Sequence, residues 1–237
     1  MPAEVVLETR GLTMRFGGVE AVSEVDFLLR EGELRCLIGP NGAGKSTFFK
    51  CLTGQLRPSA GDVLLRDEHV VGRDPWWIAQ RGVGVKTQSP SVFNGLTVRE
   101  NIWLAARRRH GARAVDRATD EIVERLALGP TRGALVGQLA HGQRQAVEIG
   151  MMMAAEPWLV LLDEPAAGMT HEEVERTVEV IREINRTATM IIVEHDMQFI
   201  RMIADVVTVF HQGAILVEDH VDAVLNDARV RDVYLGK

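Results

Sequence analysis

This chain of 237 residues has little cysteine, and it lacks long apolar runs and an excess of basic residues. The two cysteines, Cys36 and Cys51, have no C-x-x-C or cysteine-histidine spacing, so we expect buried reduced thiols and no structural metal site. No apolar run approaches the roughly 18 residues of a membrane span, and the N-terminus has no basic and apolar signal segment. These absences predict a cytosolic protein that reaches a membrane only through a partner.

The charge balance argues against another class of protein, without excluding a local basic patch. A net charge of -6 argues against a nucleic-acid binder that works by bulk electrostatics, so no nucleic-acid partner is expected. With 46% hydrophobic and 25% charged residues, the composition is that of an ordinary globular protein with a sizeable core.

The stretch from Gly39 to Ser46 fits G-x-x-x-x-G-K-[ST], the phosphate loop of nucleotide-binding proteins. Glycines let backbone N–H groups surround a triphosphate, and Lys45 adds a mobile positive charge for the β- and γ-phosphates. The hydroxyl of Ser46 can ligate the Mg²⁺ that accompanies the nucleotide. A predicted strand before the loop and a helix after it favour this interpretation over a chance glycine-rich turn. The residues expected to hold ATP here are Gly39, Pro40, Asn41, Gly42, Ala43, Gly44, Lys45, Ser46 and Thr47.

Two apolar strands later in the chain end in polar residues. Four consecutive apolar residues, 159–162, indicate a strand covered on both faces, and Asp163 and Glu164 follow at its carboxyl end. Asp163 suits the water shell of Mg²⁺, and Glu164 is placed to orient or deprotonate an attacking water. His195 follows the strand 190–193, where a γ-phosphate contact competes with a structural role.

Three features are weaker when taken alone. Phe16, in the turn after a predicted N-terminal β run, is either a core aromatic or a stacking surface for adenine. Gln88 follows a short strand and is typical of a solvated amide. The signature segment, Leu139 to Gln143, opens a helix whose free N–H groups form a second candidate anion site.

Helical patterning covers about sixty residues from Leu96 onward. A capping box at Thr97 starts one helix, Asp116 is expected to cap a second, and another capping box begins at Thr170. We predict a single domain over 1–237, in which 1–88 and 156–237 form a β subdomain plus nucleotide core and about 89–155 form an inserted helical subdomain with the signature helix.

Taken in order, these motifs resemble the ATP-binding subunits of ABC transporters over essentially the whole chain. The resemblance implies an α/β fold: a P-loop NTPase core with a RecA-like mixed sheet, an N-terminal antiparallel β subdomain and the helical insertion. It also implies roles for single residues. Phe16 would stack on adenine, Gln88 would sense Mg²⁺ and the transmembrane partner, and His195 would contact the γ-phosphate. The implied catalytic set is Glu164 as base with His195, Lys45 and Gln88, and the implied Mg²⁺ set is Ser46, Gln88 and Asp163.

The same resemblance implies a head-to-tail dimer. The signature residues of one subunit, Ala140, His141, Gly142 and Gln143, would close over the ATP held by the other. The family signature usually reads Leu-Ser-Gly-Gly-Gln, so Ala140 removes a hydroxyl expected to reach the γ-phosphate. A hydrogen bond to a charged group is worth about 1.5–3 kcal/mol, which predicts weak hydrolysis at the half-site that this chain completes. Thr170 replaces an aspartate found in many relatives, a smaller departure.

Subgroup motifs narrow the resemblance further. The run 14–18, the signature segment and the tail 233–236 resemble the ATPases of branched-chain amino acid importers, and look closest to the urea-type branch. Such importers pair two ABC ATPases with transmembrane permease subunits and, indirectly, a periplasmic binding protein, on the inner face of the plasma membrane. Urea or short amides are the first interpretation of the solute, and branched-chain or hydrophobic amino acids the alternative. A soluble ABC ATPase without a permease and a P-loop kinase are further alternatives.

Overall fold

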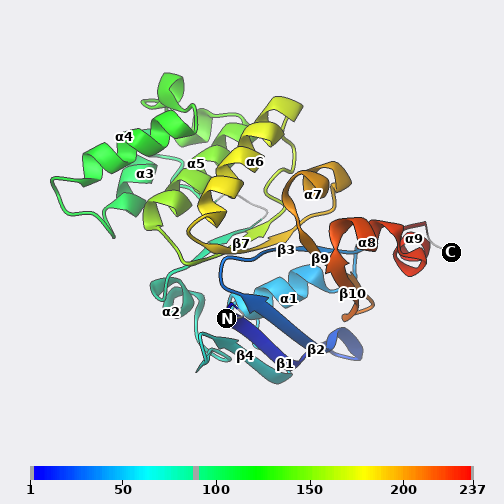
Figure 1. The fold of residues 1–237 in the computed structure, drawn as a ribbon. Helices are drawn as coiled ribbons and strands as arrows, with labels where there is room; N and C mark the ends of the chain where they lie inside the picture. The colour runs from blue at the N-terminus through cyan, green and yellow to red at the C-terminus, as the bar shows by residue number, and fades with distance from the viewer. Residues whose placement is uncertain (1–2, 88–90, 236–237) are drawn as a thin grey trace.

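Two β-sheets and the helix between them form the frame of the protein (Figure 1). The structure, a computed structural model, describes residues 3–87 and 91–235. The smaller sheet is antiparallel and has the strand order β2-β1-β4-β5. Its strands are β1 (Val5–Phe16), β2 (Val19–Arg30), β4 (Ala60–Leu65) and β5 (Glu68–His69).

The larger sheet has the order β10-β9-β3-β8-β7-β6 and is parallel except for β10 at its edge. The mixed sheet and the separate antiparallel sheet agree with the predicted architecture. Its strands are β3 (Leu34–Ile38), β6 (Val83–Lys86), β7 (Leu159–Asp163), β8 (Thr189–Val193), β9 (Val206–His211) and β10 (Ala214–His220).

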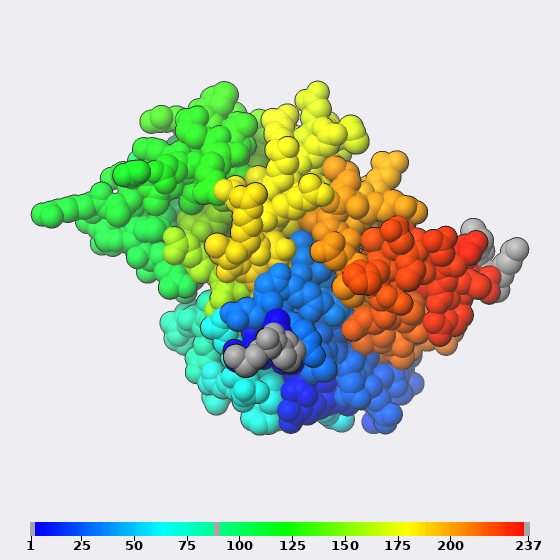
Figure 2. Space-filling model, viewed as in Figure 1, coloured from blue at the N-terminus to red at the C-terminus, as the bar shows by residue number. Residues whose placement is uncertain are grey.

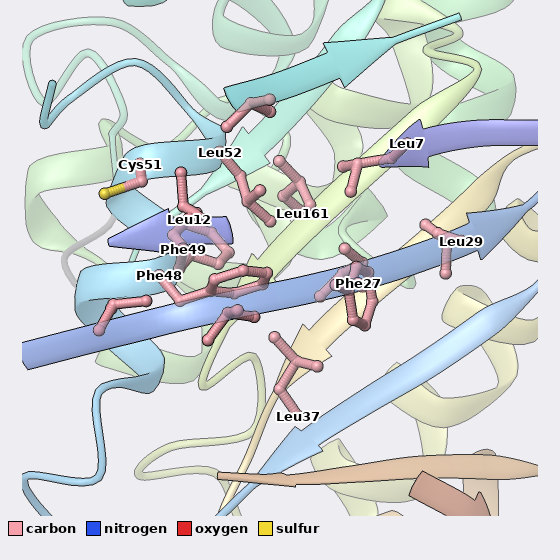
Figure 3. Close-up of a cluster of buried hydrophobic side chains, with 14 of the residues drawn as sticks. Leu7, Leu12, Phe27, Leu29, Leu37, Phe48, Phe49, Cys51, Leu52 and Leu161 are labelled. Atoms are coloured by element: carbon pink, nitrogen blue, oxygen red, sulfur yellow. The ribbon is translucent and has the colours of Figure 1, made fainter. Parts of the chain in front are cut away.

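Helix α1 (Lys45–Leu52) fills the space between the two sheets. Figure 3 shows its side chains meeting residues of both sheets. The Phe48 ring lies 5.6 Å from that of Phe27 on β2 and 5.1 Å from that of Phe210 on β9, measured between ring centroids. Burial of these rings ties the start of α1, and hence the loop before it, to both sheets.

The far face of the larger sheet packs against helices that follow the signature segment. Along β7, Leu159 and Leu161 face α1, whereas Val160 and Leu162 face the opposite helices. This alternation between two apolar clusters confirms the prediction of a strand covered on both faces. The covering helices are α5 (His141–Ala155), α6 (His171–Asn185), α7 (Met197–Ile203), α8 (Val221–Asn226) and α9 (Ala228–Leu235).

Helices α3 (Val98–Ala106), α4 (Val115–Arg125) and α5 share a third apolar cluster and form a lobe on one side of the molecule (Figure 2). The capping box at Thr97 is confirmed, because its hydroxyl accepts from Glu100 N and the Glu100 carboxylate accepts from Thr97 N. The prediction that Asp116 caps α4 is wrong. Ala114 occupies the N-cap, and the Asp116 carboxylate instead pairs with Arg99 at 2.8 Å.

The remaining features of the fold are the lengths of the N-terminal strands and three short helices. The N-terminal strands β1 and β2 are twelve residues long each, and β-bulges interrupt their pairing without ending it. In the two described ranges, no helix is long and apolar enough to cross a membrane. The remaining elements are α2 (Pro75–Gln80), η1 (Gly129–Thr131) and η2 (Val136–Gln138).

Candidate nucleotide site

The predicted phosphate loop joins the buried strand β3 to the first residue of α1. Gly39, Gly42 and Gly44 have φ angles of 147°, 79° and 105°, in the region that favours glycine. Two of these glycines also lie where no side chain fits. A Cβ at Gly39 would lie 2.3 Å from the carbonyl oxygen of Phe210, and one at Gly44 would lie 2.4 Å from that of Ala21. Backbone conformation and close neighbours both require glycine at positions 39 and 44.

Lys45 closes the loop on itself. Its Nζ donates to the carbonyl oxygens of Gly39, at 2.7 Å, and Pro40, at 3.0 Å. Burial lowers the pKa of Lys45, and the nearby carboxylates of Glu164 and Asp163 oppose that shift. The lysine therefore lies in the field of both predicted acidic residues. Of the other predicted loop residues, Asn41, Gly42 and Ser46 are exposed, Pro40, Gly44 and Thr47 are half-buried, and Gly39 and Ala43 are buried.

Asp163 is the last residue of β7 and is buried at the carboxyl end of the sheet. Burial raises its pKa to about 6, and the charge of Glu164 adds to this effect. Among the described residues, its Oδ1 atom has no hydrogen-bond partner. A buried carboxylate oxygen without a partner fits a hydrated divalent cation, which prefers oxygen ligands.

Glu164 and His195 lie side by side just after the neighbouring strands β7 and β8. Glu164 Oε1 is 3.4 Å from His195 Nδ1, and Glu164 N donates to the carbonyl oxygen of Val193 at 2.9 Å. The φ angle of Glu164 is 48°, an uncommon conformation for a residue with a side chain. The surrounding contacts maintain this conformation, which six other described residues with side chains also adopt.

Two further charged residues belong to this edge and were not singled out from the sequence. Glu194 is buried, and its carboxylate accepts from the backbone N–H groups of Ala166 and His195. Lys86 is fully buried at the end of β6, and its charge acts to lower the pKa of Asp163 against the effect of burial. Lys86 is the last residue of the short strand β6, and Glu194 directly follows the apolar strand β8, so the sequence does contain a signal for both.

Phe16 ends β1 and pairs with Val19 across the hairpin. The residue is 47% exposed, which excludes the alternative of a core aromatic. The same hairpin reaches the phosphate loop, because Ala21 on β2 contacts Gly44. The exposed side chain of Phe16 therefore belongs to the β1–β2 hairpin, which flanks the phosphate loop. Gln88 lies outside the described residues.

The signature segment begins α5 and lies apart from the other predicted residues. Ala140 is the N-cap and has no side-chain acceptor, while the Gln143 side chain accepts from Ala140 N at 3.2 Å. Gly142 is buried against α6, where a Cβ would lie 2.8 Å from Glu173 Oε1. In the described part of the chain, no hydrogen bond or ion pair joins residues 140–143 to the phosphate loop. Thr170 caps α6 as predicted, since its hydroxyl accepts from Glu173 N.

Residues 22–167 match the family model described as "ABC transporter". The chain belongs to the ABC transporter family. Full-length relatives of this family include the high-affinity branched-chain amino acid transport ATP-binding protein LivG of Salmonella typhimurium, 36% identical over 99% of both chains. The corresponding protein BraF of Pseudomonas aeruginosa is 34% identical over 98% of each chain.

Solved structures of ABC transporter cassettes have the same fold. The ADP conformation of MJ1267, an ATP-binding cassette of an ABC transporter, superposes with a TM-score of 0.86 at 26% identity, covering 99% of this chain and all of that one. A nucleotide-free ATP-binding cassette superposes with a TM-score of 0.87 at 25% identity and the same coverage. The chain is therefore an ABC ATPase domain that binds and hydrolyses ATP, and the predicted fold class is confirmed.

Asp163→Asn should change how stability depends on pH in protein stripped of nucleotide and metal. Because the folded-state pKa of Asp163, about 6, lies above the ordinary value of 3.8, its charge opposes folding at high pH. Relative to the variant, the free energy of unfolding of the wild type falls by about 3 kcal/mol as the pH rises from about 4 to 6. Above pH 6 the difference stays constant.

Urea denaturation at pH 4, 6 and 8 in the presence of EDTA measures this difference. The variant Asp205→Asn, at an exposed carboxylate, is the control. A difference between wild type and Asp163→Asn that is the same at all three pH values would contradict the expectation.

Proposed function

We propose that this chain is the ATP-hydrolysing subunit of an importer for branched-chain amino acids, located in the cytoplasm against the inner face of the plasma membrane. The observation that carries this proposal is its similarity over nearly its whole length to LivG and BraF, two proteins named for that transport. These relatives favour amino acids over urea, the solute that the subgroup motifs suggested first. Neither LivG nor BraF is named for urea transport.

The phosphate loop binds the triphosphate of ATP. Its glycine-rich backbone presents N–H groups to the phosphates, and the start of α1 adds a favourable dipole. Lys45 exchanges its two contacts with loop carbonyls for phosphate oxygens, and Phe16, exposed on the neighbouring hairpin, stacks on adenine. This part of the proposal is supported by the loop geometry and by the exposure of the ring.

Ser46, Asp163 and Gln88 would hold Mg²⁺ beside the phosphates. When bound, the metal neutralises charge that develops on the phosphate oxygens. The oxygen of Asp163 without a partner and the exposed hydroxyl of Ser46 support this assignment.

Glu164 orients the attacking water and accepts its proton. Its carboxylate lies at the sheet edge within 3.4 Å of His195, whose exposed imidazole is free to reach the γ-phosphate. Most of the catalysis is positional and electrostatic, since Lys45 and the loop N–H groups stabilise the phosphate charge.

Two ABC ATPase subunits, identical or different, complete each other's sites. The separation of residues 140–143 from the phosphate loop of the same chain leaves them available to a partner's nucleotide. His141, Gly142 and Gln143 open α5, whose N-terminal N–H groups attract phosphate.

Transmembrane permease subunits dock on a groove between β6, α3 and α5, and a periplasmic binding protein acts through them. The groove has a volume of about 810 Å³, and Phe93 and Leu104 at its walls are exposed apolar residues. The groove runs along β6 as far as Val85, the residue before Lys86.

Glu164→Gln should keep MgATP binding while nearly abolishing turnover, because the amide fits the same space but cannot accept the proton of water. ATPase activity of the assembled importer and nucleotide binding by equilibrium dialysis measure the two effects. Glu175→Gln, at an exposed position on α6, is the control and keeps both. Undiminished hydrolysis by Glu164→Gln would remove Glu164 from the role of base.

Ala140→Ser should increase ATP turnover roughly tenfold, since it restores a hydroxyl whose bond to a charged phosphate is worth about 1.5 kcal/mol. The matched control is Ala114→Ser, because Ala114 is also an N-cap without an acceptor but belongs to α4. Equal effects of the two substitutions would assign the gain to helix capping alone.

Deletion of the gene should abolish uptake of labelled leucine and leave urea uptake unchanged. Re-expression of the wild type restores leucine uptake, and re-expression of Glu164→Gln does not. Loss of urea uptake without loss of leucine uptake would overturn the assigned solute.

A further inference from the structure

Gln145, on the second turn of α5, connects the signature helix to the loop that follows Glu164. Its side chain is fully buried. Its Nε2 atom donates to the carbonyl oxygen of Ala167 at 3.0 Å and lies 2.7 Å from Nε2 of His141. One amide group therefore joins the start of α5 to a loop 22 residues further along the chain.

The orientation of this amide is set by its neighbours. A reversed amide would place the oxygen of Gln145 against the carbonyl oxygen of Ala167, so the nitrogen must face the loop. Among the described residues, the amide oxygen has no hydrogen-bond partner although it is buried. A buried acceptor left unsatisfied is costly, which indicates that the two contacts of the nitrogen are the reason for this residue.

His141 completes the connection on the helix side. Because the amide nitrogen of Gln145 donates, the facing Nε2 of His141 accepts, and its proton lies on the other ring nitrogen. The ring also lies against the loop, where a Cβ at Gly168 would come within 3.4 Å of His141 Cδ2. Gly168 has a φ angle of 71°. The loop thus approaches the signature segment through a glycine.

The other end of the connection reaches the proposed base. Ala167 N donates to the carbonyl oxygen of Glu164 at 3.3 Å, which closes a turn directly behind the acidic residues. Glu164 holds its uncommon φ angle in this turn. Such a conformation persists only where the surrounding contacts determine it. Gln145 supplies one of those contacts from outside the loop.

We propose that Gln145 is a positioning residue for Glu164: by holding Ala167 against the start of α5, it fixes the turn that aims the Glu164 carboxylate. This inference rests on the proposed role of Glu164 as base.

Gln145→Met tests the proposal, because methionine has a similar volume and lacks both donors. In the assembled importer we expect kcat for ATP to fall about tenfold, as a misplaced base requires. The KM for MgATP should stay within about twofold of the wild type, because the phosphate loop is not altered. Gln145→Leu, which also lacks a donor for the Ala167 carbonyl, should give the same split.

Two further measurements separate positioning from a general loss of structure. Asn185→Leu is a matched control, since Asn185 is another amide that donates to two backbone carbonyls, those of Gly32 and Ala188 near the end of α6. It should lower the thermal unfolding temperature as Gln145→Met does and leave kcat unchanged. In the Glu164→Gln background, Gln145→Met should lower the residual rate by less than about twofold, because the two residues act through one group.

The proposal is overturned if Gln145→Met keeps the wild-type kcat, or if the effects of Gln145→Met and Glu164→Gln multiply in the double variant. Undiminished hydrolysis by Glu164→Gln alone would overturn both this inference and the proposed base. If Glu164→Gln loses turnover as expected and Gln145→Met keeps the wild-type kcat, only this inference is overturned.

Discussion

The nucleotide site depends on two places where backbones approach too closely for a side chain. Gly39 lies against the carbonyl of Phe210, and Gly44 lies against that of Ala21. One contact joins the loop to β9 of the larger sheet, and the other joins it to β2 of the smaller sheet. Helix α1, buried between the sheets, holds the loop in both contacts at once. The apolar core is thus what gives the loop its shape.

Charge is concentrated at the carboxyl ends of β7 and β8, and the surroundings compensate each carboxylate differently. Glu194 is satisfied by backbone N–H groups, and Glu164 has a histidine beside it. Asp163 has the attraction of buried Lys86 but keeps an oxygen without a partner among the described residues. Since desolvation without a partner is costly, a divalent cation has its largest effect at Asp163.

The sequence predicts those features that depend on local pattern. Four apolar residues before Asp163 predict a strand buried on both faces, and the capping box at Thr97 predicts the start of a helix; both are confirmed. Features that depend on distant neighbours were missed. The Asp116 carboxylate could either cap α4 or pair with Arg99. Only the packing of α3 on α4 decides between these two roles. The contact between Gln145 and Ala167 likewise requires the position of α5 against the sheet.

The turn between β9 and β10 has a consequence for how the protein is made. Gly213 donates to the carbonyl oxygen of Ala43 in the phosphate loop and accepts from Ser23 N on the hairpin. Segments from three distant parts of the chain therefore meet at one glycine. Because synthesis proceeds from the N-terminus, a nascent chain carries its phosphate loop for most of translation without these contacts. The contacts that hold the phosphate loop against the hairpin and this turn are completed only after the turn at Gly213 has left the ribosome.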